Sequence, residues 1–154
     1  MFCIFFKSNG WVSFTMLPQG KTMDGDAYIN DCLIPMTTEI KTQRPVSGTK
    51  NSIFHHDNAR PHVHKRVKEY LQNEGYTVMK QPPYSPDLAP ADFWLFDFIK
   101  RKLKNHSTQE SLFDDIENIL NQITKRDWSR TFQKWQDRMN LCIQNKGEYF
   151  EHLL

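Results

Sequence analysis

The sequence predicts an α/β fold in which strands and helices alternate over about the first half of the chain and helices alone follow in the second half. Short segments rich in β-forming residues occur at residues 1–6, 11–17, 52–56 and 76–79. Apolar residues recur at three- and four-residue spacing near the carboxyl end, as in Leu112, Ile116 and Ile119. The predicted order is β-β-α-β-α-β followed by helices, which is typical of an α/β domain.

The opening residues predict a β-hairpin. Residues 1–6 form a continuous apolar run, and residues 11–17 alternate in polarity and are rich in β-formers. Between them, Asn9-Gly10 is a favoured turn pair, and Pro18 ends the second strand.

A helix and a loop are predicted next. Asp24 is a suitable N-cap for a helix that runs to about Thr38. Residues 39–51 are polar and contain Pro45 and Gly48, which predicts a loop.

The middle of the chain predicts a strand–helix–strand step. Residues 52–56 form a short β-leaning run, and residues 61–74 fit a helix that Gly75 terminates. Residues 76–79 form the next strand.

A connector with four prolines, residues 81–90, precedes the helices predicted at 91–104, 109–123 and 127–143. No internal repeat or second domain is evident. We expect one partial domain over residues 1–154, made of a hairpin (1–17), a motif-bearing core (52–104) and carboxyl-terminal helices (105–154).

The composition is that of an ordinary globular protein. Hydrophobic residues make up 38% and aromatic residues 13% of the 154 residues, which is enough apolar surface to exclude intrinsic disorder. A net charge of +2 permits a nucleic-acid partner without indicating one.

The cysteines indicate neither a disulfide framework nor a zinc site. Cys3, Cys32 and Cys142 are odd in number, widely separated and without a C-x-x-C pair. The apolar run at residues 1–6 is too short for a signal peptide, and no segment is long enough to span a membrane. We therefore expect isolated thiols in an intracellular protein with no membrane association.

Two aspartates are candidates for metal chemistry. Asp57 ends a predicted strand in HHDNARPH, and Asp92 begins a predicted helix in YSPDLAPADFWLF. Ligand sites form at strand ends and helix N-termini in α/β proteins. Two carboxylates brought together there repel one another, and a divalent cation such as Mg²⁺, which prefers oxygen ligands, relieves the repulsion. Taken singly, each aspartate also fits an ordinary cap or turn.

Four other aspartates have a simpler explanation. Asp87 fits a turn residue in its Ser-Pro-Asp-Leu run. Asp24, Asp26 and Asp31 fall at or inside a predicted helix, and the helix dipole favours the first two near the helix start. We expect none of the four to be a metal ligand.

The two candidate motifs resemble those of a known family. HHDNARPH (55–62) and PPYSPDLAPADFWLF (82–96) resemble the hallmark motifs of mariner-type transposases, in the Tc1/mariner superfamily. The 34 residues between Asp57 and Asp92 match the separation of the last two aspartates in that family's three-aspartate signature. The resemblance covers almost the whole chain, because residues 17–30 and the GEYFE tail also resemble family segments.

The resemblance implies an RNase H-like mixed sheet flanked by helices, and a DDE endonuclease that cleaves and joins DNA in cut-and-paste transposition. Asp57 and Asp92 are then catalytic metal ligands in a site for two Mg²⁺ or Mn²⁺ ions. Transposon-end and target DNA are the expected partners, a homodimer is the expected assembly, and the nucleus is the expected location.

The family's first aspartate lies on a central strand upstream of the hairpin, and the sequence begins at Met1. We therefore expect an N-terminally truncated domain that also lacks the helix-turn-helix region and the dimer-clamping loop. It should be inactive alone, because the first aspartate bridges both ions. The missing strand leaves a gap between the hairpin and the strand before Asp57. Either these strands close the gap, or the chain is marginally folded with edges prone to association.

Other residues near the motifs have weaker assignments. Several basic side chains are candidates for phosphate contacts, although such clusters also occur on solvated helix faces. They are Arg60, Lys65, Arg66, Lys100 and Arg101.

Histidines surround Asp57, at positions 55, 56, 62 and 64. We expect strand and helix geometry to scatter these rings, which disfavours a joint ligand role. Trp94 and Phe96 are expected in the core rather than stacked on bases.

Two further hypotheses remain open. The chain is either a domesticated module that binds DNA or a partner without catalysis, or the tail of a methyltransferase–transposase fusion. Salt-dependent DNA binding favours the module, since its slope reports phosphate contacts.

Overall fold

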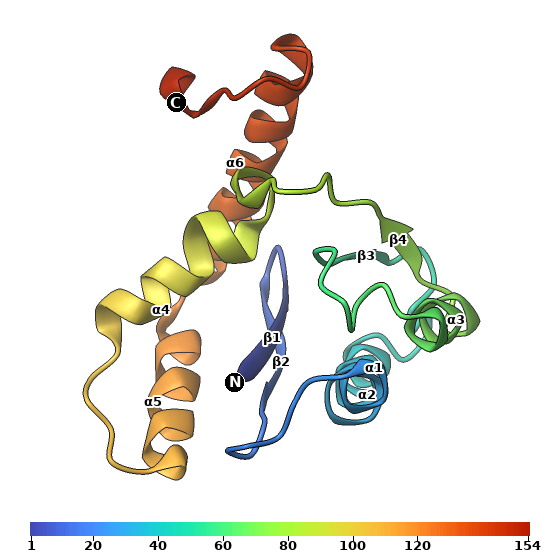
Figure 1. Cartoon of the computed structure of the whole chain (residues 1–154), viewed down its shortest axis with the longest axis vertical. Coiled ribbons are helices and arrows are strands. Elements are labelled where there is room, and N and C mark those ends of the chain that lie inside the picture. Colours follow the sequence, from blue (N-terminus) through green and yellow to red (C-terminus); the bar gives the residue numbers. More distant parts are fainter. The chain divides into compact units, whose positions relative to one another are not determined.

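The computed structural model describes residues 1–154, which divide into two compact units. The first unit comprises Met1–Phe6 and Trp11–Pro83, and the second comprises Lys7–Gly10 and Tyr84–Leu154. The main elements follow the predicted order of strand, strand, helix, strand, helix, strand and then helices (Figure 1). The predicted α/β class is therefore confirmed.

The opening hairpin is present as predicted. Strands β1 (Phe2–Lys7) and β2 (Gly10–Met16) form a two-stranded sheet. The turn residues are Ser8 and Asn9, so the predicted Asn9-Gly10 turn is shifted by one residue, and Gly10 already belongs to β2.

A second sheet pairs β3 (Ile53–His55) with β4 (Thr77–Met79) in parallel. Parallel neighbours require a crossover connection, and helix α3 (Lys65–Asn73) lies on it. In the register, Phe54 lies opposite Val78.

The predicted mixed sheet is two separate sheets. β1 pairs only with β2, and β3 pairs only with β4. The gap predicted between the hairpin and the strand before Asp57 is therefore not closed by strand pairing. No strand lies between β1 and β3 to join the two pairs.

A continuous helical segment follows the hairpin. Its three parts are α1 (Gly25–Ala27), the π-helical η1 (Tyr28–Leu33) and α2 (Ile34–Gln43). Asp24 is its N-cap, as predicted, and its carboxylate accepts a hydrogen bond from the Ala27 N–H over 2.8 Å. A side-chain acceptor at this position satisfies one of the free N–H groups of the first turn.

This segment is longer than predicted. It ends at Gln43, so the helix end predicted at about Thr38 is wrong, and the loop predicted at residues 39–51 begins only at residue 44. Ile40 is buried, and the Lys41 ammonium lies 2.6 Å from a carboxylate oxygen of Glu74. These tertiary contacts favour the extra turn despite the polar local sequence.

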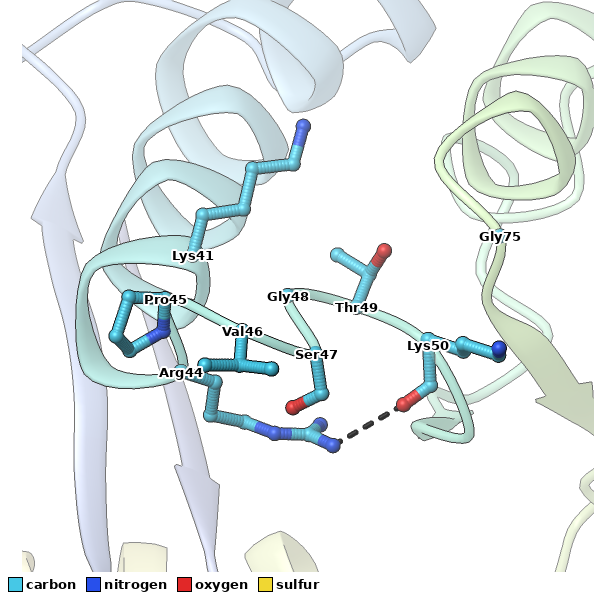
Figure 2. Close-up of a pocket in the computed structure, with 9 residues that line it drawn as sticks. All are labelled: Lys41, Arg44, Pro45, Val46, Ser47, Gly48, Thr49, Lys50 and Gly75. Carbon is cyan, nitrogen blue, oxygen red and sulfur yellow. Dashed lines mark hydrogen bonds between the residues drawn. The ribbon is translucent and has the colours of Figure 1, made fainter.

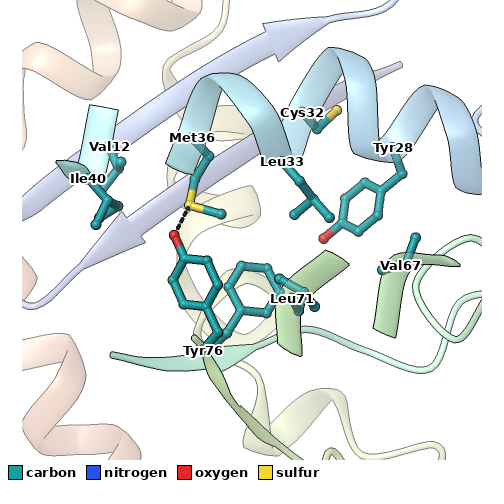
Figure 3. Close-up of a cluster of buried hydrophobic side chains, with 10 residues drawn as sticks. Val12, Tyr28, Cys32, Leu33, Met36, Ile40, Val67, Leu71 and Tyr76 are labelled. Atoms are coloured by element: carbon teal, nitrogen blue, oxygen red, sulfur yellow. Dashed lines mark hydrogen bonds between the residues drawn. The ribbon is translucent and has the colours of Figure 1, made fainter. Parts of the chain in front are cut away.

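The core of the first unit lies between this helical segment, α3 and the strands. Its fully or nearly buried side chains, drawn in Figure 3, are Val12, Tyr28, Cys32, Leu33, Met36, Ile40, Phe54, Val67, Leu71 and Tyr76. Tyr76 buries its hydroxyl against the Met36 sulfur at 3.5 Å and the Thr37 hydroxyl at 3.2 Å. The buried phenol is thus hydrogen-bonded, as a polar group in a core must be.

Helix α3 begins at Lys65 rather than at the predicted residue 61. His64 is its N-cap, with an extended backbone, and turn hydrogen bonds precede it. The predicted end is confirmed, because Gly75 follows the C-cap Glu74 with φ of +80°. That left-handed conformation is one that glycine adopts without steric cost.

The second unit is helical. Its elements are η2 (Pro86–Leu88), η3 (Ala91–Leu95), α4 (Phe96–Lys102), α5 (Gln109–Gln122), α6 (Lys125–Gln144) and η4 (Glu151–Leu153). The three predicted helices are confirmed to within two residues at each end, whereas the short η2 and η4 were not predicted. Thr124 and Asp127 form a capping box that starts α6.

The interior of the second unit is an apolar cluster contributed mainly by η3, α4, α5 and α6. Its buried members include Leu95, Ile99, Ile116, Ile119, Leu120, Ile123 and Trp128. The Trp94 and Trp128 rings meet edge to face with centroids 5.1 Å apart. No helix of the chain combines the length and apolar character that crossing a bilayer requires.

Candidate functional site

Asp57 lies two residues beyond the last residue of β3, at the carboxyl end of a parallel strand. Its Oδ1 accepts a hydrogen bond from the Ala59 N–H over 3.0 Å and lies 2.5 Å from Nδ1 of His62. The Asp57 side chain is 56% exposed. The carboxylate is therefore held by the turn that follows β3 and remains open to solvent.

The surroundings of Asp57 keep it ionised. Partial burial by itself raises the pKa of this carboxyl. The hydrogen bond from Ala59 and the nearby His62 ring outweigh that effect, and the pKa of Asp57 lies below its ordinary value. At neutral pH the group is a carboxylate, the form that binds a cation.

His56 and His62 stack beside Asp57. Their ring centroids are 4.9 Å apart with an interplanar angle of 9°, and the centroids of His62 and Tyr28 are 4.4 Å apart. Burial, followed by the neighbouring His62, lowers the pKa of His56 to about 4, so this ring is neutral at pH 7. The expectation that the histidines scatter is wrong for this pair, because the turn after β3 folds back onto the strand end.

The other two histidines have different neighbours. His55 lies 2.7 Å from the amide oxygen of Gln81, and His64 packs over Gly25. No group of three or more His, Cys, Asp or Glu side chains in the chain is arranged to hold a metal ion.

Asp92 is the second residue of η3 and is exposed. Its N–H donates to the carbonyl of Ala89 over 2.9 Å, which fixes the first turn of the helix. Its predicted place at a helix start, just after the proline-rich connector, is confirmed. Asp57 belongs to the first unit and Asp92 to the second.

Helix α6 secures the connector that leads to Asp92. The Trp135 indole N–H donates to the carbonyl of Leu88 over 2.8 Å. Arg138 donates to the carbonyl of Asp87 over 3.0 Å and to Glu151 over 2.8 Å, and its guanidinium lies 4.4 Å from the centroid of the Phe93 ring. These contacts hold η2, and with it the entry to η3.

The remaining aspartates have structural roles. The carboxylate of Asp26 accepts hydrogen bonds from Arg66 over 2.6 and 2.7 Å, and that of Asp31 accepts one from Lys21 over 2.6 Å. Asp24 caps the helical segment, and Asp87 turns the connector. The simpler explanation given for these four is thus supported by their contacts.

The candidate phosphate-binding residues differ in their ion pairs. Arg66 is bound to Asp26, Arg101 lies 2.8 Å from Asp97, and Lys65 lies 3.7 Å from Glu69. Arg60 and Lys100 are exposed and form no ion pair. All five remain predictions, with Arg60 and Lys100 the least engaged within the chain.

Two aromatic residues were expected in the core. Trp94 packs against Trp128 and Phe98 within the second unit, as expected. Phe96 is 41% exposed, so that expectation is wrong. The three cysteines are free thiols, as predicted.

A basic pocket lies outside both motifs. It encloses about 490 Å³ near the end of α2 and is lined by Lys41, Arg44, Pro45, Val46, Ser47, Gly48, Thr49, Lys50 and Gly75 (Figure 2). The guanidinium of Arg44 donates to the carbonyl of Lys50 over 3.0 Å. The sequence offered no signal for this pocket, because its walls come from the last turn of α2, the loop that follows it and the distant Gly75.

The segment that carries the candidate site matches a known protein family. Residues 1–117, which include both candidate aspartates, match the family described as DDE superfamily endonuclease. Because the match covers more than half of the chain, the chain belongs to this family.

Two curated proteins are similar to almost the whole chain. The Mariner Mos1 transposase of Drosophila mauritiana is 28% identical over 160 residues, which cover 98% of this chain and 45% of that protein. The histone-lysine N-methyltransferase SETMAR of Homo sapiens is 27% identical over 158 residues, covering 98% of this chain and 22% of that protein. The chain thus spans less than half the length of these curated relatives.

The fold agrees with these relationships. The crystal structure of the Mos1 catalytic domain superposes with a TM-score of 0.89 at 26% identity, covering 97% of this chain and 75% of that one. The RNase H-like α/β fold is therefore confirmed. Structures of the Mos1 catalytic domain with Mn and with Mg, and of the Mos1 paired-end complex with the left transposon end, match with the same TM-score. Divalent metals are thus consistent with this family.

Proposed function

We propose that residues 1–154 are part of a mariner-type transposase catalytic domain in which Asp57 and Asp92 are metal ligands for DNA cleavage and strand transfer. The observation that carries the proposal is the ionised, exposed carboxylate of Asp57 at the end of a parallel strand, with 34 residues between it and an exposed Asp92 at a helix start. Membership of the DDE superfamily endonuclease family supports it.

The chemistry of these residues fits a hard divalent cation. Carboxylate oxygens are the ligands that Mg²⁺ and Mn²⁺ prefer, and both side chains are exposed. When bound, such ions would activate an attacking hydroxyl and stabilise the leaving oxygen of a phosphodiester. Asp57 and Asp92 would each hold one ion. Within the first unit the turn after β3 would hold the Asp57 carboxylate, and within the second unit the α6 contacts to the connector would support the helix start that carries Asp92.

We further propose that the 154-residue polypeptide taken alone does not cleave DNA. It carries two of the family's three aspartates, since Asp24, Asp26 and Asp31 are engaged as a cap and in ion pairs. Without the bridging carboxylate, positioning for in-line displacement is lost, and positioning accounts for roughly 7–11 kcal/mol of such barriers.

DNA is the proposed partner, with a homodimer as the proposed assembly and the nucleus as the proposed location. The unpaired Arg60, next to the Asp57 motif, and the unpaired Lys100, eight residues after Asp92, are suited to phosphate contacts. The complex of Mos1 with its left transposon end supports DNA as the partner.

A second candidate function is supported by the similarity to SETMAR, which extends over 98% of the chain. The chain would then be the tail of a methyltransferase–transposase fusion. A domesticated module that binds DNA without cleaving it is the related alternative, and it agrees with the proposed inactivity of these residues alone.

The test combines a DNA-binding and a nicking assay on the purified chain. We expect binding to duplex DNA that weakens strongly between about 50 and about 200 mM salt, and no nicking with Mg²⁺ or Mn²⁺. Absence of binding at the lower salt would overturn the DNA partner. Metal-dependent nicking that disappears in Asp57→Ala would overturn the proposed inactivity.

A further inference from the structure

The two oxygens of the Asp57 carboxylate are not equivalent. Oδ1 accepts from the Ala59 N–H over 3.0 Å and lies 2.5 Å from the His62 ring nitrogen, and Oδ2 accepts no hydrogen bond. The side chain as a whole is 56% exposed. One oxygen is therefore saturated by the protein, while the other is open to a ligand from solvent.

The direction of the hydrogen bond from His62 follows from the chemistry of its acceptor. An ionised carboxylate is an acceptor only, so the His62 nitrogen that faces it, Nδ1, carries the proton and donates. Because this donor belongs to a ring and not to the backbone, its placement depends on what fixes the ring.

Two aromatic neighbours fix the His62 ring. The Tyr28 ring lies 4.4 Å away by centroids, and the His56 ring stacks at 4.9 Å. Tyr28 is 1% exposed and belongs to the buried cluster of the first unit. The ring that donates to Asp57 is thus anchored, through Tyr28, to the core, and only 22% of its side chain is exposed.

We propose that His62 is a positioning residue that occupies Oδ1 of Asp57 and so presents Oδ2 as the single oxygen available to a divalent cation. This inference rests on the proposed function, which makes Asp57 a metal ligand. A carboxylate limited to one oxygen suits Mg²⁺ and Mn²⁺, which retain several waters. Partners that fix a ligating side chain in this way alter metal affinity without touching the metal.

Mn²⁺ affinity of the full 154-residue chain tests the proposal, with free Mn²⁺ followed by electron paramagnetic resonance. Four variants separate the possible roles of the histidine. His62→Ala removes ring and donor, His62→Phe keeps the ring without the donor, and His62→Asn keeps a donor near the Nδ1 position without the ring. Asp57→Asn removes the charge of the proposed ligand.

We expect His62→Ala and His62→Phe to bind Mn²⁺ about 10- to 100-fold more weakly than the unaltered chain, and His62→Asn to retain most of the affinity. A merely structural role in packing predicts the opposite ranking, in which Phe is tolerated and Asn is not. Circular dichroism of each variant verifies that it is folded.

The outcomes distinguish the two levels of the proposal. Unchanged Mn²⁺ affinity in Asp57→Asn would overturn the proposed metal role of Asp57 itself. Weakened affinity in Asp57→Asn together with full affinity in His62→Phe would leave that role standing and overturn the positioning role of His62.

Discussion

Gly25 begins α1 directly against the ring of His64. A Cβ added at Gly25 would lie 2.8 Å from both Cγ and Nδ1 of His64 and 3.0 Å from its Cβ, which is too close for non-bonded atoms. Gly25→Ala should therefore destabilise the chain by about 1–3 kcal/mol, although alanine is the better helix former. The free energy of unfolding in urea measures the effect.

The matched control for this substitution is the same change in a His64→Ala background, where the obstructing ring is absent. There the loss should shrink or reverse. A Gly25→Ala chain as stable as the parent would show that His64 moves aside without cost.

At the scale of single residues, the sequence predicted what the motifs contain but not how their members meet. Asp57 and Asp92 were predictable because a strand end and a helix start are local features. The contact of His62 with Asp57 was not, because it depends on the irregular turn at residues 58–61. No periodic pattern encodes such a turn.

Helix α6 contributes Arg138, whose side chain is 14% exposed. It donates to the Asp87 carbonyl and to Glu151 and covers the Phe93 ring. Arg138→Lys keeps the charge but loses the planar fork, so we expect a loss of about 1–3 kcal/mol of stability, as measured by chemical denaturation. Arg130→Lys, at an exposed position of the same helix, should change stability by less than about 0.5 kcal/mol. Equal effects at both positions would contradict the role given to Arg138.

The Arg138–Glu151 pair also predicts a pH dependence. The hydrogen bond from Arg138, followed by that from Tyr149, lowers the pKa of Glu151 below its ordinary value. A lowered pKa in the folded state gives stability that is present above the unfolded-state pKa and lost as the pH falls through the folded-state pKa. The destabilisation by Arg138→Lys should therefore be smaller at about pH 3 than at about pH 7. A difference that is independent of pH would exclude a contribution from this pair.

At the scale of elements, strongly periodic helices were predicted well, whereas helix ends that depend on tertiary contacts were not. Helix α5 follows the spacing of Ile116 and Ile119 closely. Helix α2 runs past its predicted end because Ile40 and Lys41 find partners distant in sequence. Helix α3 begins at Lys65 and not at the predicted residue 61, because residues 61–64 belong to the hydrogen-bonded turns that follow Asp57.

For the chain as a whole, the separation of the strands into two sheets leads us to predict self-association of the chain. Every strand has only one hydrogen-bonded neighbour, so β1 and β3 each leave one edge unpaired. Unpaired strand edges are templates for pairing with other chains, and we expect concentration-dependent self-association in sedimentation velocity. A single monomeric species at all concentrations, with a cooperative unfolding transition, would contradict this expectation.

At the scale of the whole chain, the order of elements could be predicted from the sequence, whereas the pairing of the strands could not. The order of elements and the fold class followed from periodicity and turn chemistry, because these are local properties. The split into two two-stranded sheets depends on which strands find hydrogen-bonding partners, and that is a property of the whole chain.

The central claim, that Asp57 and Asp92 are metal ligands, is tested most directly by paramagnetic broadening of amide NMR signals during a Mn²⁺ titration. We predict that the amides of Asn58, Ala59, Ala91 and Phe93 broaden first, and that Asp57→Asn and Asp92→Asn each abolish broadening around the altered residue. Broadening confined to other acidic surfaces, or unchanged in both variants, would contradict the claim.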